Sequence, residues 1–232
     1  MRILILFLCF LFFSISFFSQ EGYTDIKEFG LNGNVKSIES KYYSIKENQG
    51  KWILDTLNSQ SKMYFNNNGG ITKMVNQSFS QLETETIEIQ RDQNGRKISY
   101  HKYNENGIFE TGYYQWVDER KYQIKAKDSF GFRMESEFTL TKNFRDKSGI
   151  TLYYDDRSGE HLLTHQYENI LDQEGNLLSS KITYEPLHNS TTMIFEVQET
   201  DDFGNWIMVN LYKEEEEKES RQIMIRNIEY YK

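Results

Sequence analysis

The stretch Arg91-Asp92-Gln93-Asn94-Gly95-Arg96-Lys97-Ile98 contains the sequence motif that recurs along this chain. An aspartate is followed three positions later by a glycine, and the chain on either side reads as β-strand. Asp or Asn at the first position of a tight turn accepts hydrogen bonds from backbone N–H groups further on, and glycine takes the positive-φ position that closes the turn. The stretch therefore predicts a turn between two β-strands.

The same spacing of an acidic or amide residue and a glycine recurs along the chain. The glycines lie 26, 12, 24, 18, 10, 16 and 29 residues apart, and an interval near 12 corresponds to one strand plus one turn. The period is irregular, so we interpret it as a degenerate repeat of about 13 to 15 strands and not as a strict solenoid. The predicted structural turns are Asn66 with Gly69, Asp92 with Gly95, Asn104 with Gly107, Asp128 with Gly131, Asp146 with Gly149, Asp156 with Gly159, Asp172 with Gly175 and Asp201 with Gly204.

The segments between these turns alternate between apolar and polar residues. Met134, Phe138 and Leu140 fall on one side of a strand, and Glu135 and Glu137 fall on the other. This period of two is typical of half-buried antiparallel strands. The predicted fold is all-β: an antiparallel meander of hairpins whose twisted sheet curls into a sandwich-like or partly open barrel. The segment 24–29 is expected to form one helical turn ahead of the first strand.

The N-terminal residues have the features of a targeting segment. Arg2 precedes an unbroken apolar run over residues 3–13, and serines follow it, so residues 1–19 are predicted to be a signal peptide and residues 20–232 a single all-β repeat domain. A retained anchor is the less favoured alternative, and no stable transmembrane anchor is expected after cleavage. Cys9, the one cysteine, lies in this segment, so the mature chain is expected to have no disulfide and no thiolate site.

The charge and composition narrow the possible locations and partners. The chain of 232 residues is 38% hydrophobic and 15% aromatic, which is too apolar for a disordered protein. Its net charge of −8 does not favour nucleic acid as a partner. We therefore expect an exported protein of the periplasm, the outer surface or the medium, with a protein or carbohydrate partner at the cell envelope.

Three of the turn segments carry a resemblance to a known repeat family. The stretches 91–98, 171–177 and 201–206 resemble the tyrosine–aspartate (YD, or RHS-type) repeats of bacterial surface and secreted proteins. The general character of the sequence, including Ser19-Gln20 at the end of the predicted signal peptide, is similar to that of small exported proteins of unassigned role in Bacteroidetes-type bacteria. The resemblance implies a β-hairpin fold and supplies no catalytic residues. Short repeat proteins with such hairpins also include immunity or antitoxin-like partners.

Motifs for catalysis or metal binding are weak in this sequence. His161 and His165 are four residues apart, but on a strand that spacing places them about 13 Å from each other, too far to share one metal. Isolated acids in the turns lack the dense oxygen spacing of calcium loops. We therefore predict no catalytic residue, no metal and no cofactor. The strongest candidate for a binding site is an aromatic face formed by Trp52, Trp116 and Trp206, because exposed aromatic rings suit carbohydrate or protein surfaces.

These observations favour a non-catalytic binding or structural module of the cell envelope with an unknown ligand. The alternatives are an immunity or antitoxin-like partner of a secreted toxin and, less favoured, a glycan-active enzyme.

Overall fold

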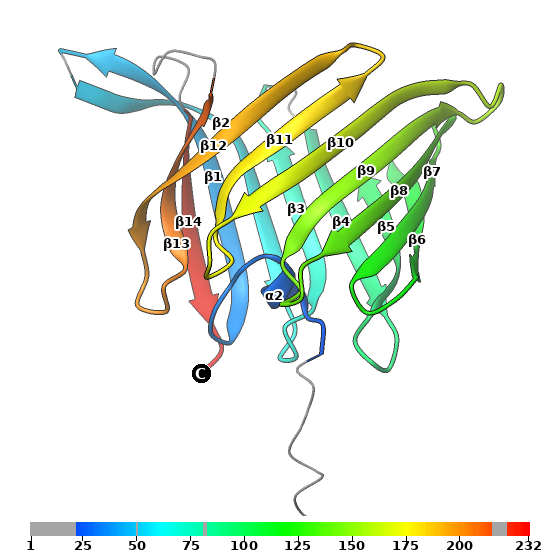
Figure 1. Ribbon diagram of the computed structural model, residues 1–232, viewed down its shortest axis with the longest axis horizontal. Helices are drawn as coiled ribbons and strands as arrows, with labels where there is room; N and C mark the ends of the chain where they lie inside the picture. Colours follow the sequence, from blue (N-terminus) through cyan, green and yellow to red (C-terminus); the bar gives the residue numbers. More distant parts are fainter. Residues whose placement is uncertain (1–21, 50, 81–82, 215–221) are drawn as a thin grey trace, which may run out of the picture.

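The part of the chain that the structure describes forms a closed, antiparallel β-barrel with one short helix at one of its ends (Figure 1). The computed structural model describes residues 22–49, 51–80, 83–214 and 222–232, so the predicted signal peptide and Cys9 lie outside the described residues. Within these ranges no helix is long and apolar enough to cross a membrane. The elements are α2 (Asp25–Glu28), β1 (Val35–Asn48), β2 (Lys51–Phe65), β3 (Ile71–Ser78), β4 (Glu83–Arg91), β5 (Lys97–Asn104), β6 (Gly107–Trp116), β7 (Lys121–Asp128), β8 (Phe132–Leu140), β9 (Asp146–Asp155), β10 (His161–Leu171), β11 (Leu177–Glu185), β12 (Asn189–Thr200), β13 (Trp206–Lys213) and β14 (Gln222–Tyr230).

Each strand pairs with its neighbours in the sequence, and the first strand also pairs with the last. Along the closing seam between β1 and β14, Ile38 lies opposite Ile228 and Ser40 lies opposite Arg226. The predicted all-β meander that curls toward a barrel is confirmed. The closure is complete, so every strand pairs with two others along the barrel wall.

The turns that follow the even-numbered strands all lie at the end of the barrel that holds the helix; we call them the rim turns. In the rim turn after β4, the Asp92 carboxylate accepts hydrogen bonds from the backbone N–H groups of Asn94 and Arg96, both at 2.9 Å. The turns that begin at Asn66, Asp172 and Asp201 repeat this pattern. The rim turns span residues 66–70, 92–96, 117–121, 141–145, 172–176 and 201–205.

The glycines of four rim turns adopt the positive φ that the turn chemistry requires. The φ angle is 75° at Gly69, 80° at Gly95, 90° at Gly175 and 78° at Gly204. The N–H of Gly175 donates to the Asp172 carbonyl at 3.2 Å, and the N–H of Gly204 donates to the Asp201 carbonyl at 2.9 Å. In the turns 172–176 and 201–205 the structure therefore uses the residues that the sequence spacing selected, and it places both turns at the same end of the barrel.

The described turns after β5, β7 and β9 lie at the opposite end, and one of them differs from the predicted pairing. Gly107, Gly131 and Gly159 all adopt positive φ there. In the turn after β9, however, the acceptor is the carboxylate of Asp155, which takes hydrogen bonds from the N–H groups of residues 157 and 158, and not that of Asp156. The two acids are adjacent, and the sequence spacing selected the wrong one because this turn is one residue longer.

The predicted turn at Asp146 and Gly149 is wrong, since both residues lie inside strand β9. The rim turn comes five residues earlier, where the Thr141 hydroxyl takes the place of the carboxylate and Phe144 adopts the positive φ of 62°. Gly149 has a different role, because the ring of Tyr167 lies over it and a Cβ there would come within 2.5 Å of the ring. The glycine makes room for an aromatic ring inside the barrel.

Along β7 and β8 apolar side chains face the interior, and charged side chains face outward. Met134, Phe138 and Leu140 of β8 pack in an interior cluster with residues of β5 and β7. On the outer face Lys125 lies opposite Glu135, and across the next pairs of strands Glu168 lies opposite Lys181. Barrels that face lipid alternate the other way, with apolar residues outside and polar residues inside.

Candidate ligand site at the plugged mouth of the barrel

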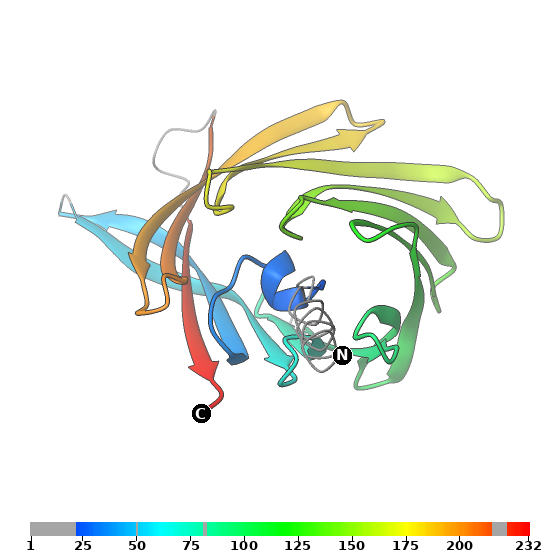
Figure 2. The same cartoon turned by 60° about the horizontal axis from the view of Figure 1, so that its bottom comes forward.

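Residues 22–34 lie inside the rim end of the barrel; we call this segment the plug (Figure 2). It contains α2, which begins after Thr24 because the Thr24 hydroxyl accepts a hydrogen bond from the N–H of Lys27. The backbone N–H of Ile26 donates to the carbonyl of Gly69, which belongs to a rim turn. An eight-strand barrel is just filled by its own side chains, so a fourteen-strand barrel needs an additional element to fill one end.

A buried cluster of charges joins the plug to the barrel wall. Asp25 has no exposed surface, and its carboxylate accepts hydrogen bonds from the guanidinium of Arg91 and from the N–H of Ile71. The ammonium of Lys97 lies 3.1 Å from Asp25 and 2.9 Å from Glu28. Burial opposes the charge on Asp25, but Lys97 and Arg91 together hold the pKa of this carboxyl below its usual value. The carboxylates of Glu28 and Asp25 raise the pKa of Lys97 above its usual range against the effect of burial.

Aromatic hydroxyls complete the hydrogen bonds of this cluster. Tyr122 donates to Glu28 at 2.7 Å, and Tyr23 of the plug donates to both Asp25 and Glu28. Burial and the adjacent carboxylates raise the pKa of both tyrosines, so they remain protonated donors. The two acids therefore have two cations and two hydroxyls as partners. This cluster fixes the plug and offers no vacant position to a ligand.

The other end of the plug is fixed by an amide pair. The side-chain carbonyl of Asn205 accepts from the N–H of Asn32 at 2.7 Å, and its amide group donates to the Asn32 carbonyl at 2.9 Å. Asn205 also donates to the hydroxyl of Tyr230 at 2.7 Å. Both ends of the plug are therefore bonded to rim turns or to strand ends.

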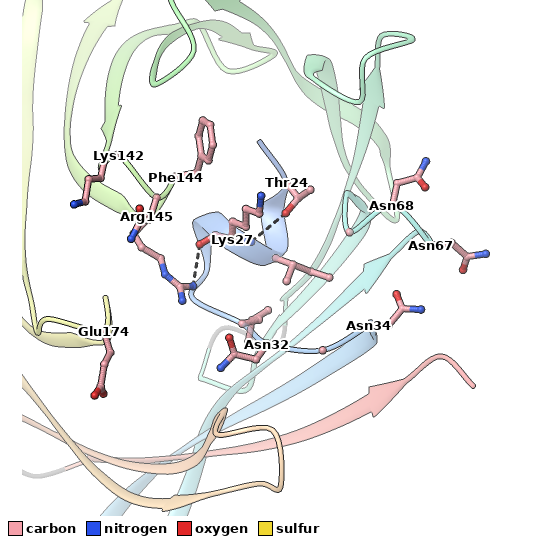
Figure 3. A pocket seen from close by; sticks show the side chains of 15 residues that line it. Thr24, Lys27, Asn32, Asn34, Asn67, Asn68, Lys142, Phe144, Arg145 and Glu174 are labelled. Atoms are coloured by element: carbon pink, nitrogen blue, oxygen red, sulfur yellow. Dashed lines mark hydrogen bonds between the residues drawn. The ribbon is translucent and has the colours of Figure 1, made fainter. Parts of the chain in front are cut away.

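A cavity of about 760 Å³ lies between the plug and the rim turns (Figure 3). The plug contributes Thr24, Lys27 and Asn32, and the rim turn 141–145 contributes Lys142 and Arg145. Arg145 also fixes its own position by donating to the carbonyl of Lys27 at 3.0 Å. A second cavity of about 360 Å³ adjoins the first and shares Lys142 and Phe144 with it.

Three of the predicted turn glycines lie at this mouth: Gly69 lines the larger cavity, and Gly175 and Gly204 lie close to its lining residues. A Cβ at Gly175 would lie 3.1 Å from Nε of Arg145, and a Cβ at Gly204 would lie 3.9 Å from the side-chain nitrogen of Asn32. The turn 172–176 therefore packs against the cation of the neighbouring rim turn, and the turn 201–205 packs against the plug. These glycines are structural, and they help to bring the lining residues together.

Positive charge is concentrated around these two cavities. They are lined by five cations and two carboxylates, in a chain whose net charge is −8. The larger cavity also has five asparagines, whose amide groups both donate and accept hydrogen bonds. The cations are Lys27, Arg96, Arg120, Lys142 and Arg145, the carboxylates are Glu119 and Glu174, and the asparagines are Asn32, Asn34, Asn67, Asn68 and Asn143.

Phe144 adds an aromatic ring at the place where the two cavities meet. The ring lies edge-on to Tyr23, with ring centroids 6.3 Å apart, and the ammonium of Lys27 lies 5.7 Å from its centroid. Cations, amides and an aromatic ring together can recognise a polar, anionic ligand that has an apolar face.

The three tryptophans predicted as an aromatic face are not brought together. Trp116 packs against Tyr23 of the plug with ring centroids 4.7 Å apart, and Trp206 packs against the interior cluster that contains Val209. Their strands, β6 and β13, are seven positions apart in a ring of fourteen, so they lie on opposite sides of the barrel. Trp52 lies in β2, and its side chain is outside the described part of the structure.

The two histidines also lie apart. The ring of His161 lies against Tyr154, whose other neighbour is the outward-facing Arg133, whereas His165 stacks on Tyr184 inside the barrel at 5.0 Å. A register shift between residues 161 and 163 places them on opposite faces. Among the described residues, no group of three or more His, Cys, Asp or Glu side chains could hold a metal ion.

Sequence reasoning missed the cavity residues because they lie on separate turns. The sequence did contain one usable signal, because successive turns in a series of hairpins alternate between the two ends of the sheet. Every second turn of a meander falls at the same end, and sorting the turns in this way would have placed residues 142–145 beside 67–69.

Comparison with solved structures supports the fold. A porin-like protein from Bacteroides uniformis is similar over 85% of this chain and 99% of its own, with a TM-score of 0.51 and 8% sequence identity. A porin-like protein from Bacteroides vulgatus is similar over 85% of this chain and 98% of its own, with a TM-score of 0.48 and 8% identity. The sequence matches no protein-family model and no curated protein sequence, so the resemblance to YD repeats finds no support beyond the shared turn chemistry.

Proposed function

We propose that this protein is an exported, non-catalytic binding barrel of the cell envelope that takes an acidic saccharide at its plugged mouth. The observation that carries the proposal is the cavity of about 760 Å³, which is rich in cations and amides although the protein is acidic.

The charges around the cavities favour an anionic ligand over a neutral one. Lys142 is exposed and lines both cavities, so its ammonium is available to a ligand. A concave surface of one charge sign concentrates its field and attracts ligands of the opposite sign. The acidic remainder of the surface repels such ligands, which confines their binding to the mouth.

A saccharide fits the remaining groups better than a simple inorganic anion does. The asparagine amides can bond to hydroxyl groups as donors and as acceptors. Phe144 offers a ring face suited to the apolar face of a sugar. A hydrogen bond from Arg145 to the plug and another within its rim turn hold Arg145 in place before a ligand arrives, and this lowers the entropy lost on binding.

The charged residues on the outer face of the barrel support a location in an aqueous compartment. Strands that pair Lys125 with Glu135 and Glu168 with Lys181 on the outside would place charges in hydrocarbon if the barrel crossed a bilayer. This charge pattern supports our proposal that the protein lies in the aqueous part of the envelope or outside the cell.

Calorimetry with the mature chain, residues 20–232, tests the function. Tetragalacturonate is the acidic probe, and maltotetraose is the neutral probe of equal length. We expect tetragalacturonate to bind more tightly at low salt and to weaken as salt is added, because the attraction between exposed charges is screened. Lys142→Ala should weaken binding several-fold. Lys125→Ala removes the same charge from the outer face of the barrel and should leave binding unchanged. Equal binding of the two sugars, or equal effects of the two variants, would refute the proposal.

A further inference from the structure

Inside the barrel, Arg226 has no anionic partner among the residues that the structure describes. Arg226 lies on β14 between Met224 and Ile228, which both pack in interior clusters, so strand alternation points its side chain inward as well. Directly across the closing seam it faces Ser40, which is buried. None of these residues lines the two cavities at the mouth.

Two of the three nitrogens of this guanidinium are unsatisfied. Within the described part of the chain, Nε and Nη1 of Arg226 are buried and have no hydrogen-bond partner, and no salt bridge joins Arg226 to a carboxylate. Burying a charged donor without a partner is costly, so native proteins rarely keep such a group without a reason. The guanidinium lies over the ring of Trp206, and this cation–π contact offsets part of the cost.

The surroundings of Arg226 are apolar apart from Ser40 and the hydroxyl of Tyr42, both on β1. Val209, Leu211 and Met224 form a buried cluster on strands β13 and β14. Tyr42 packs against this cluster, and burial raises the pKa of its hydroxyl while the charge of Arg226 opposes that rise. Burial also lowers the pKa of Arg226 itself, because the charged form has lost its hydration.

We propose that Arg226 anchors an internal site for an amphiphile with an anionic head group, whose apolar tail packs on the partly buried side chains of Tyr42, Met193 and Phe195 beside the cluster around Val209. A carboxylate or sulfate presents two oxygens that match the guanidinium fork and would satisfy its free N–H groups. The tail replaces contacts with water by contacts with apolar side chains. This site is separate from the saccharide site at the mouth.

The test uses the mature chain and three probes of equal chain length below their micellar concentrations: decanoate, decanol and decyltrimethylammonium. We expect decanoate to raise the melting temperature of the protein by several degrees, decanol to raise it less and the cation to have no stabilising effect. Equal stabilisation by decanol and decanoate, or no effect of decanoate, would overturn the proposal.

Arg226→Met separates a binding role from a structural one. Methionine fills similar space without a charge, so the ligand-free variant should be as stable as the wild type or more stable. Decanoate binding should fall at least tenfold. The matched control is Arg133→Met on the outer face, where Arg133 lies over the Tyr154 ring; it should bind decanoate as the wild type does. Undiminished binding by Arg226→Met would refute the assignment.

A second measurement does not depend on the folding of that variant. In a chain carrying Trp52→Phe and Trp116→Phe, Trp206 is the single tryptophan. Because Trp206 lies against Arg226, decanoate should change its emission in a saturable manner, and decanol should not. Lys142→Ala should leave this response intact, which distinguishes the internal site from the mouth. An unchanged Trp206 spectrum would count against the site.

Discussion

Lys97 Nζ lies 3.1 Å from a carboxylate oxygen of Asp25, and this ion pair joins the barrel wall to the plug. Lys97 begins strand β5, whereas Asp25 begins the helix inside the barrel. The pair is almost completely buried, with exposed side-chain fractions of 7% and 0%. Because each partner would be costly to bury alone, the pair holds only while the plug occupies the barrel.

Loss of the Asp25 charge should strongly destabilise the protein. Asp25→Asn leaves Arg91 and Lys97 with a single carboxylate, and removing one partner of a buried ion pair typically costs about 3–5 kcal/mol. Urea unfolding followed by circular dichroism measures the loss. Asp118→Asn is the matched control: Asp118 accepts a hydrogen bond within an exposed rim turn, and the asparagine carbonyl can accept the same bond. Equal stabilities of the two variants would show that the plug is not held by its charges.

The Asp146 carboxyl should give stability an unusual dependence on pH. Burial raises its pKa to about 6, although hydrogen bonds from Tyr167 and Asn169 favour the charged form. Between about pH 4 and 6 the folded state therefore holds a proton that the unfolded state has released, so this group lowers stability as pH rises through that window.

Asp146→Asn should remove this contribution. Relative to the wild type, the unfolding free energy of the variant should increase by about 2 kcal/mol in total as pH rises from 4 to 7. Asp25 has a lowered pKa, so its contribution to stability increases as pH rises. The wild type and the Asp146→Asn variant both contain Asp25, so this contribution cancels in the difference between their unfolding free energies. Unfolding free energies measured at several pH values give the comparison, and a difference that does not vary with pH would contradict the prediction.

Gly149→Ala should destabilise the barrel through the ring of Tyr167. The new Cβ would lie 2.5 Å from Cε1 of Tyr167 and 2.9 Å from Cδ1 of Phe138. Forcing such rings aside in a packed interior typically costs about 1–3 kcal/mol. In a Tyr167→Ala background the ring is absent, and the same substitution should cost much less. A double-mutant cycle from chemical unfolding checks this, and additive costs would mean that the ring is not the obstacle.

Phe144 combines backbone strain with a role in the cavity. Its φ of 62° is a left-handed conformation that glycine adopts without strain and other residues adopt at a cost of about 1–2 kcal/mol. Phe144→Ala and Phe144→Gly both remove the ring, so both should weaken tetragalacturonate binding. The glycine variant should be the more stable of the two by about 1 kcal/mol in urea unfolding. An alanine variant of equal or higher stability would contradict this reading of the turn.

The strands and the direction of their side chains could be predicted because they depend on local chemistry. Alternation in residues 133–141 placed Met134, Phe138 and Leu140 together, and these side chains face the interior. The helical turn expected over residues 24–29 is present as α2, since the capping group Thr24 is adjacent in sequence. The turn predicted at Asp146 was wrong because an identical spacing served another purpose, namely space for a ring from another strand.

The candidate sites could not be predicted, because each joins residues from distant parts of the chain. Lys27 and Arg145 meet across 118 positions at the mouth, and Asn32 and Asn205 meet across 173. Nothing near Arg226 in the sequence shows that its guanidinium would lack a partner. That follows from the registers of β1, β13 and β14 along the closing seam.

The sequence by itself determined a series of antiparallel hairpins, since turn chemistry and period-two alternation act over a few residues. Only the tertiary structure decided that β1 would pair with β14, that the segment before β1 would enter the barrel, and that alternate turns would surround it with cations. The physical reason is that closure depends on the twist and register summed over all the strands, and charge balance in the interior depends on which side chains that closure brings together.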